Sequence, residues 1–532
     1  MRIAATASLL ATLIAAALPS TATAQGPRPG GTLTIGLATQ AQCIDPQQDN
    51  YGYGSRDGRQ LVDSLTDQAY DDPTRIVPWL ATSWTVGDQG RTYVFRLRGD
   101  VTFSDGTKLD AQVVKDNFEA LAKIPGAAGA AYFRGLKAIT VEDPLTLRIE
   151  FAEPNIPFLQ ASSTAELGIV SPATVAKTAE RRCFEGVVGS GPFVIESIAR
   201  NEKAVLAKRQ GYGWPSALRG HQGDAYLDRI VYRVLPEASV RNGALLSNQV
   251  DLIQNPSFQD AVRLKAAGYE LVSVQSLGLS VTLVLNTATP VLQDKAVRLA
   301  LRHGINRQEV VDIAYSGLQT AATGLLTPKS ANYVDQSADL TFDPQKAARI
   351  LDEAGWKAGP KGVRAKDGKP LSITVSFFAN PLNQAFLEVI QQQLRDLGFD
   401  FNLRPLNAGQ FDETLLAGRY DLHRWAWFLA DPDVLRAVYS TKTLNRFRLG
   451  ADNPIDGLLD AQRAATDPVE RRRLTDQVQK IIIDEAYGIP VFDSVGLWGA
   501  NRLIQGVTYG PGSSGGPNQI LYDAWIADNK TE

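Results

Sequence analysis

The sequence has few of the residues that usually bind metals or attack substrates. Only three histidines, His221, His303 and His423, occur among 532 residues, and no two of them have the i, i+4 spacing of an H-E-x-x-H metal site. No G-x-S-x-G motif is present, and the glycine-rich residues 510–517 are not followed by the Lys-Ser/Thr pair of a phosphate-binding loop. We therefore expect no metal site and no cofactor, and we do not expect an enzyme.

Neither sign of charge dominates the sequence. It contains 54 lysines and arginines and 57 aspartates and glutamates, which gives a formal net charge of −3, and the two signs are mixed along the chain. A surface that binds nucleic acid usually shows as clustered lysine and arginine, and no such cluster is present. Nucleic acid is therefore not an expected partner.

Long apolar runs are absent after the N-terminal segment. There, Arg2 precedes an apolar run over residues 4–18, and the small residues Ala22–Ala24 follow. This order is typical of a secretory signal peptide cleaved near Ala24, and the run is shorter than the ~20 residues that span a bilayer. We expect residues 1–24 to be a signal peptide and the mature protein to be exported and soluble.

Cysteine is rare as well, since Cys43 and Cys183 are the only two. In an exported protein an isolated pair is more commonly a disulfide than two free thiols. Two cysteines alone are also too few to complete a metal site. The sequence therefore predicts a Cys43–Cys183 bond.

Signals for strands and helices alternate along the chain without a fixed repeat, which is typical of a mixed α/β protein with two or three domains. Residues 91–109 alternate apolar and polar positions on both sides of an Asp-Gly pair at 105–106, which predicts a β-hairpin. Residues 341–356 predict a helix that Asp343 caps and Gly355 ends.

The stretch YDLHRWAWFLADPD, residues 420–433, combines aromatic rings with acidic side chains. Open α/β sheets bind ligands beyond the carboxyl ends of their strands, and this stretch is a candidate for that edge. The residues alone leave two interpretations open. Either the stretch forms the wall of a binding pocket, or Asp431 or Asp433 works with a distant acid, as in a hydrolase.

Five blocks of the sequence together resemble one family. They are LVDSLTDQAYDDPTRIVPWLATSW (61–84), YVFRLRGDVTFSDGTKLDAQVVKDNFE (93–119), VVGSGPF (187–193), VLNTATPVLQDKAVRLALRHGINRQEVV (284–311) and FDPQKAARILDEAGW (342–356). In this order they are similar to the peptide- and nickel-type (family 5) extracytoplasmic solute-binding proteins of ABC importers. The similarity extends from about Gly30 to the C-terminus.

The resemblance implies an α/β protein with the two-lobed periplasmic-binding-protein fold, a hinge of two crossing segments, and an extra α+β domain on the first lobe. The ligand would lie between the lobes, which close over it before the closed form docks on a permease. A ligand drives closure only when it binds the closed state more tightly than the open state. The expected boundaries are residues 25–65, 189–277 and 500–532 for the first lobe, 66–188 for the extra domain and 278–499 for the second lobe.

The resemblance also places the stretch 420–433 at a ligand-contacting position of the second lobe. Aromatic rings beside a carboxylate suit a cationic group of a ligand. In the family's dipeptide and oligopeptide binders an aspartate after the tryptophan binds the peptide amine, and that position falls here at Ala430 or, with a gap, at Asp431. We expect ligand contacts from Arg424, Trp425, Trp427 and Asp431 of the second lobe and from Tyr51 and Tyr53 of the first.

Most of these residues have a structural alternative. Asp431, like Asp421 and Asp433, would cap a helix or turn instead. Arg424 would meet either a ligand carboxylate or an internal acid, and the two tyrosines would be ordinary surface residues. We expect His423 to be a packed or surface histidine and not a nickel ligand.

Taken together, the residues and the resemblance predict a periplasmic monomer that binds a small polar solute, peptide-like or an amino-acid conjugate. It would deliver this solute to the permease of an ABC transporter. The alternative within the family is a binder of an opine, a metal chelate or another non-peptide solute. The alternative from another class is a secreted hydrolase that uses Asp431.

Overall fold

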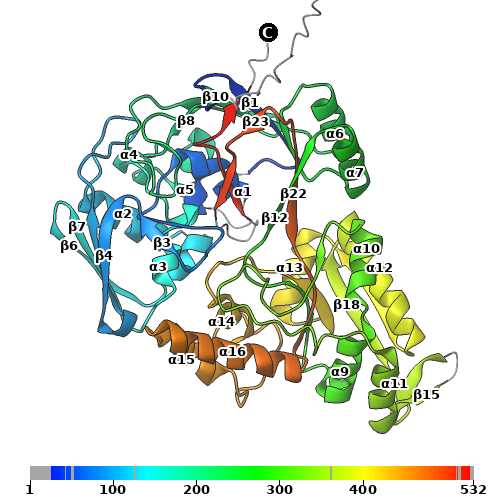
Figure 1. Cartoon of the computed structure of the whole chain (residues 1–532). Coiled ribbons are helices and arrows are strands. Elements are labelled where there is room, and N and C mark those ends of the chain that lie inside the picture. Colours follow the sequence, from blue (N-terminus) through cyan, green and yellow to red (C-terminus); the bar gives the residue numbers. More distant parts are fainter. Residues whose placement is uncertain are drawn as a thin grey trace, which may run out of the picture.

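The computed structural model describes residues 26–41, 43–48, 53–124, 127–359, 362–510, 512 and 517–527. The predicted signal peptide and Tyr51 lie outside these residues. Within them, no helix is both long enough and apolar enough to cross a membrane. Figure 1 shows two lobes, one above the other, with an added domain beside the upper lobe.

The first lobe is built on a seven-stranded mixed sheet with the strand order β12-β22-β11-β1-β10-β9-β8. The central strand β1 runs parallel to β10 and β11, and the other neighbours are antiparallel. The strands are β1 (Thr32–Leu37), β8 (Phe193–Ala199), β9 (Lys203–Lys208), β10 (Arg229–Val234), β11 (Leu252–Gln254), β12 (Glu270–Gln275) and β22 (Val495–Ala500). Two helices, α6 (Ala238–Leu246) and α7 (Phe258–Ala266), pack at its β11 and β12 side.

The added domain contains a four-stranded antiparallel sheet with the order β4-β5-β7-β6. Its apolar residues form one continuous core with those of the first lobe, so the two units are packed as one body. The elements are β4 (Ala81–Gly87), β5 (Thr92–Leu97), α2 (Ala111–Leu121), β6 (Leu136–Asp143) and β7 (Thr146–Phe151). The predicted hairpin at residues 91–109 is present only as a turn closed by a Thr102–Lys108 bridge, and the long hairpins are β4–β5 and β6–β7.

Two glycines of the VVGSGPF block are needed where this segment passes the first lobe. A Cβ atom at Gly189 would lie 1.9 Å from the carbonyl oxygen of Leu61, and one at Gly191 would lie 2.5 Å from its carbonyl carbon. Only glycine permits so close a backbone approach. The amide of Gly191 donates to the Leu61 carbonyl at 3.0 Å, which fixes this crossing.

The second lobe is built on a six-stranded sheet with the order β14-β21-β13-β20-β18-β19. Helices cover both faces, because apolar residues of α9–α12 pack on one side and those of α14–α16 on the other. The strands are β13 (Val281–Leu285), β14 (Thr320–Ala321), β18 (Ser372–Phe378), β19 (Asp400–Leu406), β20 (Leu422–Trp425) and β21 (Gly488–Asp493). The helices are α9 (Lys295–Gly304), α10 (Arg307–Tyr315), α11 (Pro344–Glu353), α12 (Pro381–Asp396), α13 (Ala408–Ala417), α14 (Val434–Tyr439), α15 (Asp456–Ala464) and α16 (Pro468–Asp484).

Two chain segments cross from the sheet of one lobe to that of the other, side by side, as the resemblance implies (Figure 1). The first runs from β12 to β13 and the second from β21 to β22, and the amide of Ser276 donates to the Ser494 carbonyl at 2.9 Å. Ser280 donates its hydroxyl to Asp493 at 2.7 Å, and burial of this carboxyl raises its pKa to about 7. β22 pairs within the first sheet, so the chain re-enters that sheet at Val495, before the expected position 500.

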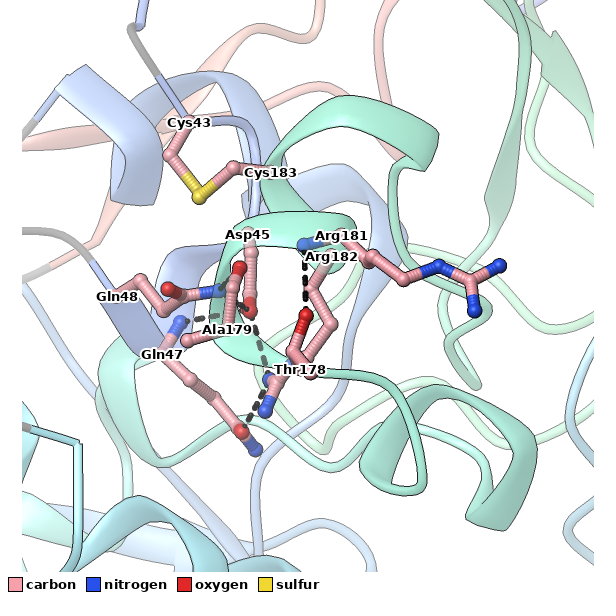
Figure 2. Close-up of a disulfide and its surroundings, with 9 residues drawn as sticks. All are labelled: Cys43, Asp45, Gln47, Gln48, Thr178, Ala179, Arg181, Arg182 and Cys183. Carbon is pink, nitrogen blue, oxygen red and sulfur yellow. Dashed lines mark hydrogen bonds and ion pairs between the residues drawn. A yellow bond between two sulfur atoms is a disulfide. The ribbon is translucent and has the colours of Figure 1, made fainter.

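The predicted disulfide is present and joins the first lobe to the added domain (Figure 2). Cys43 follows β1, and Cys183 lies on α5 (Ala179–Glu185). A buried ion pair lies beside it, because Arg182 contacts Asp45 at 2.7 Å and also donates to Gln47 at 2.6 Å. The covalent bond and the ion pair therefore hold the same two segments together.

Replacing both cysteines by alanine is expected to lower the free energy of unfolding by about 4–5 kcal/mol, because the bond closes a separation of 140 residues and a loop of that length loses much entropy when crosslinked. Urea unfolding of the wild type and the variant measures this difference. Thiol titration of the denatured, unreduced wild type should find no free cysteine. Two free thiols would contradict the bond.

Candidate functional site

The stretch 420–433 begins in the middle of the second lobe and ends near the hinge. β20 lies between β13 and β18, antiparallel to the first and parallel to the second. After the strand the chain runs against the hinge segment, where the amide of Leu279 donates to the Trp427 carbonyl at 3.0 Å. A Cβ atom on Gly278 would lie 2.6 Å from the same carbonyl oxygen, so a larger residue would push this segment away.

Side chains of β20 alternate between the two faces of the sheet. Leu422 is part of the core beneath α9–α12, and Arg424 points to the same face, where its charge acts on Tyr315 of α10. His423 and Trp425 point to the opposite face, toward the core of α14–α16. The predicted site residues Arg424 and Trp425 therefore lie at the same end of one strand but on opposite faces.

The rings of Trp425 and Trp427 lie close together and pack against the α14–α16 core of the second lobe. Their ring centroids lie 6.2 Å apart in an edge-on arrangement, and both side chains are partly buried. The guanidinium of Arg446 lies 5.2 Å from the centroid of the Trp425 ring, within the range of a cation–π contact. Sequence reasoning missed Arg446, because it lies in an irregular segment with no motif around it.

His423 is fully buried among aromatic rings, which confirms the expectation of a packed histidine. Its ring centroid lies 4.7 Å from that of Tyr420 and 5.7 Å from that of Trp425. Burial, with Arg446 and Arg424 nearby, lowers the pKa of the imidazole to about 3, so the ring is neutral. No group of three or more metal-ligating side chains occurs in the part of the chain that the structure describes.

Side-chain nitrogens without hydrogen-bond partners gather at the end of β20. Within the described residues, Nε of Arg424, Nε1 of Trp425 and Nε of Arg446 are buried donors without a partner. Nε2 of His423 is also unpaired, but it is an acceptor, because Nδ1 of the neutral ring donates to the Arg424 carbonyl at 3.3 Å. No carboxylate of the described chain forms a salt bridge with Arg424 or Arg446, and burial lowers the pKa of both guanidinium groups. Unpaired buried donors cost free energy, so this region favours an acceptor that the chain itself does not supply.

Asp431 has a cationic partner within the second lobe. Arg471 of α16 donates to both carboxylate oxygens, at 2.5 and 2.9 Å, and the two side chains are only 11% and 13% exposed. One oxygen also accepts the amide of Asp433 at 2.7 Å, which is the turn-capping alternative. A ligand cation would therefore have to displace Arg471 to reach Asp431.

The other two acids of the stretch are also bound by the chain. Asp433 precedes α14, but its side chain caps no helix and instead accepts from Gln462 at 2.5 Å. Asp421 accepts the amide of Thr374 on β18 at 2.9 Å. The expectation that these two acids are helix or turn caps is therefore wrong, because more distant donors reach them.

The two tyrosines expected from the first lobe fall outside what the structure describes. Tyr51 is not among the described residues. Tyr53 is the first residue of α1 (Tyr53–Gly58), and the structure describes its backbone but not its side chain. Contacts from these two residues stay a prediction. A point of contact between the lobes does lie near Arg424, because the ring of Phe258 on α7 packs edge-on to Tyr315 at 5.3 Å.

Residues 75–446 match the bacterial extracellular solute-binding proteins, family 5 Middle. The chain belongs to this family. Its members are the solute-binding proteins of ABC importers, and they are extracytoplasmic.

Two curated relatives show the range of solutes in this family. The nickel-binding periplasmic protein of Escherichia coli (strain K12) is 28% identical over 446 residues, which cover 79% of this chain and 82% of the relative. The glutathione-binding protein GsiB of Salmonella paratyphi A is 28% identical over 437 residues, which cover 79% of this chain and 81% of the relative.

Solved structures of the family share the two-lobed fold. NikA from Brucella suis in complex with Fe(III)-EDTA superimposes with a TM-score of 0.80 at 24% identity, covering 91% of this chain and 98% of that one. DppA from Helicobacter pylori in complex with the peptide STSA gives a TM-score of 0.75 at 24% identity, covering 94% of this chain and 99% of that one. At these identities the comparison establishes the fold and leaves the ligand open.

Replacing Asp431 by asparagine is expected to lower the free energy of unfolding by about 2–3 kcal/mol, because it leaves the largely buried Arg471 without its counter-charge. Asp476→Asn is the matched control, since its partner Arg472 lies on the same helix and that pair is 39% and 49% exposed. The control should change stability by about 0.5 kcal/mol or less. Equal effects in urea unfolding would show that Asp431 has no special structural role.

Proposed function

We propose that this protein binds a small polar solute that carries a carboxylate group, peptide-like or an amino-acid conjugate, in the periplasm. It then delivers the solute to the permease of an ABC transporter. The observation that supports the anionic group is that two arginines near the end of β20 form no salt bridge with a carboxylate of the described residues. Arg424 lies on one face of the sheet, and Arg446 lies against Trp425 on the other, so a ligand carboxylate would meet one of them, or both past the end of the strand. A carboxylate matches the planar donor fork of a guanidinium.

The aromatic residues supply the rest of the wall. Trp425 and Trp427 offer apolar surface beside the cationic groups, and the Trp425 ring already stacks with Arg446. Binding pockets of this kind combine mostly apolar walls with a few polar groups that orient the ligand. A peptide-like solute has both an anionic end and apolar parts, so it fits the combination.

A non-peptide ligand of the same family is the second candidate. One solved relative holds Fe(III)-EDTA, and another, the AgaA protein at 23% identity, holds agropinic acid. Such solutes carry acidic groups, and a guanidinium of Arg424 or Arg446 would bind an acidic group of either kind of molecule. A hydrolase is less well supported, because Asp431 and Asp433 are engaged by Arg471 and Gln462.

Arg424→Gln and Arg446→Gln test the anion-binding role. A melting-temperature screen with dipeptides, tripeptides, glutathione, opines and metal chelates first identifies a stabilising ligand. Titration calorimetry should then show that at least one of the two variants binds it about ten- to a hundred-fold more weakly, through loss of a charge-assisted hydrogen bond. Arg473→Gln is the control, because this exposed residue pairs with Glu470 on its own helix.

An amidated form of the ligand separates the carboxylate from the rest of the molecule. The amide should bind the wild type weakly, with about the affinity that the acid has for the affected variant. The affected variant itself should bind the acid and the amide with equal affinity. If both variants keep full affinity for the acid, the arginines do not bind the ligand's carboxylate.

A further inference from the structure

The second lobe touches the added domain on the side of the molecule away from the hinge. In Figure 1, α15 and α16 extend beneath the added domain, whereas β12 and β22 cross between the lobes on the other side. Arg463 of α15 donates to the side-chain oxygen of Asn155 at 3.0 Å. Its carbonyl also accepts the amide of Ile156 at 3.3 Å. One residue of the second lobe is therefore bound through both its side chain and its backbone.

The added domain holds its half of this contact rigidly. Asn155 is buried, and its amide group donates to the Tyr132 carbonyl at 3.0 Å. The Tyr93 hydroxyl donates to the Asn155 carbonyl at 2.7 Å. The Tyr93 ring in turn packs against that of Phe158 at 5.2 Å. Asn155 thus presents its oxygen to Arg463 from a fixed position.

The second lobe supports its half through the acids that follow the tryptophans. Gln462, which precedes Arg463, donates to Asp433 at 2.5 Å, and its carbonyl accepts from Arg471 at 3.2 Å. Arg471 is the residue that holds Asp431 through two hydrogen bonds. The stretch that carries Trp425 and Trp427 is therefore linked, through Asp431, Asp433, Arg471 and Gln462, to the residue that meets the added domain.

We propose that this contact is a clasp, in which Arg463 engages Asn155 and Ile156 when the lobes close and the Asp431–Arg471 pair couples the clasp to the tryptophan segment. The inference rests on the proposed function, because it assumes that lobe closure accompanies solute binding. A contact made only in the closed state stabilises that state and raises the affinity for whatever the closed state holds. The added domain would then be a direct contributor to closure.

A contact that is present in both the open and the closed state would not favour closure. Ligand-free protein can distinguish such a permanent contact from one that forms only on closure. The backbone hydrogen bond between residues 156 and 463 places them about as near as residues in paired strands, within reach of a disulfide. The variant Ile156→Cys/Arg463→Cys should therefore crosslink on mild oxidation. Peptide mapping identifies the new bond beside Cys43–Cys183, and Ile156→Cys/Arg473→Cys is the control that should not crosslink.

Small-angle scattering of ligand-free protein then compares the crosslinked variant with the wild type and with Arg463→Gln. If the clasp forms on closure, the crosslinked protein should have the smallest radius of gyration and Arg463→Gln the largest. In Arg463→Gln the ratio of closed to open molecules should be about tenfold lower than in the wild type. Arg473→Gln should match the wild type.

Two results would overturn the clasp. The first is failure of the 156–463 pair to crosslink faster than the control pair. The second is an identical radius of gyration for the crosslinked protein, the wild type and Arg463→Gln, which would show a permanent contact. Neither measurement uses a solute, so both stand apart from the ligand screen that tests the proposed function.

Discussion

A guanidinium group taken out of water needs a partner for its donors, and this requirement organises the second lobe. Arg471 has a carboxylate partner in Asp431, and Arg307 donates to backbone carbonyls of Pro490 and Leu340. In Arg424 and Arg446 the buried Nε has no hydrogen-bond partner within the described chain. The cost of leaving such donors unpaired is the basis on which we propose a ligand carboxylate at the end of β20.

The acids of the tryptophan segment have partners within the protein as well. Asp431, Asp433 and Asp421 each accept hydrogen bonds from within the second lobe. These bonds fix the path of the chain between β20 and α14, and with it the positions of Trp425 and Trp427. The ligand-facing surface that we propose is therefore cationic and aromatic, and the acids of the segment are bound within the second lobe.

Local signals in the sequence predicted the parts of the fold that local physics determines. The helix expected at residues 341–356 is α11, where Asp343 caps the amide of Lys346 at 2.7 Å and Gly355 takes a φ of +88°. The hairpin expected from Asp-Gly was the exception. Gly106 does adopt positive φ, but the turn is closed by a single isolated bridge, and β5 ends before it, at Leu97.

The site was harder to predict because its partners lie far apart in sequence. The aromatic pair of Trp425 and Trp427 was visible in the stretch itself, but Arg471, which is 40 positions from Asp431, was not. Arg446 likewise carries no sequence signal, and its position against Trp425 follows only from the packing of the second lobe. Pairing between a loop and a distant helix depends on tertiary structure, which a single sequence does not reveal.

The most direct test of this account is the chemical identity of the natural ligand. The protein should be isolated from the periplasm of its source without unfolding steps, examined by native mass spectrometry, and then denatured so that the released molecule can be analysed. We predict a small molecule with at least one carboxylate group, derived from a peptide or an amino acid. A bound molecule that is neutral or purely cationic would contradict the central claim.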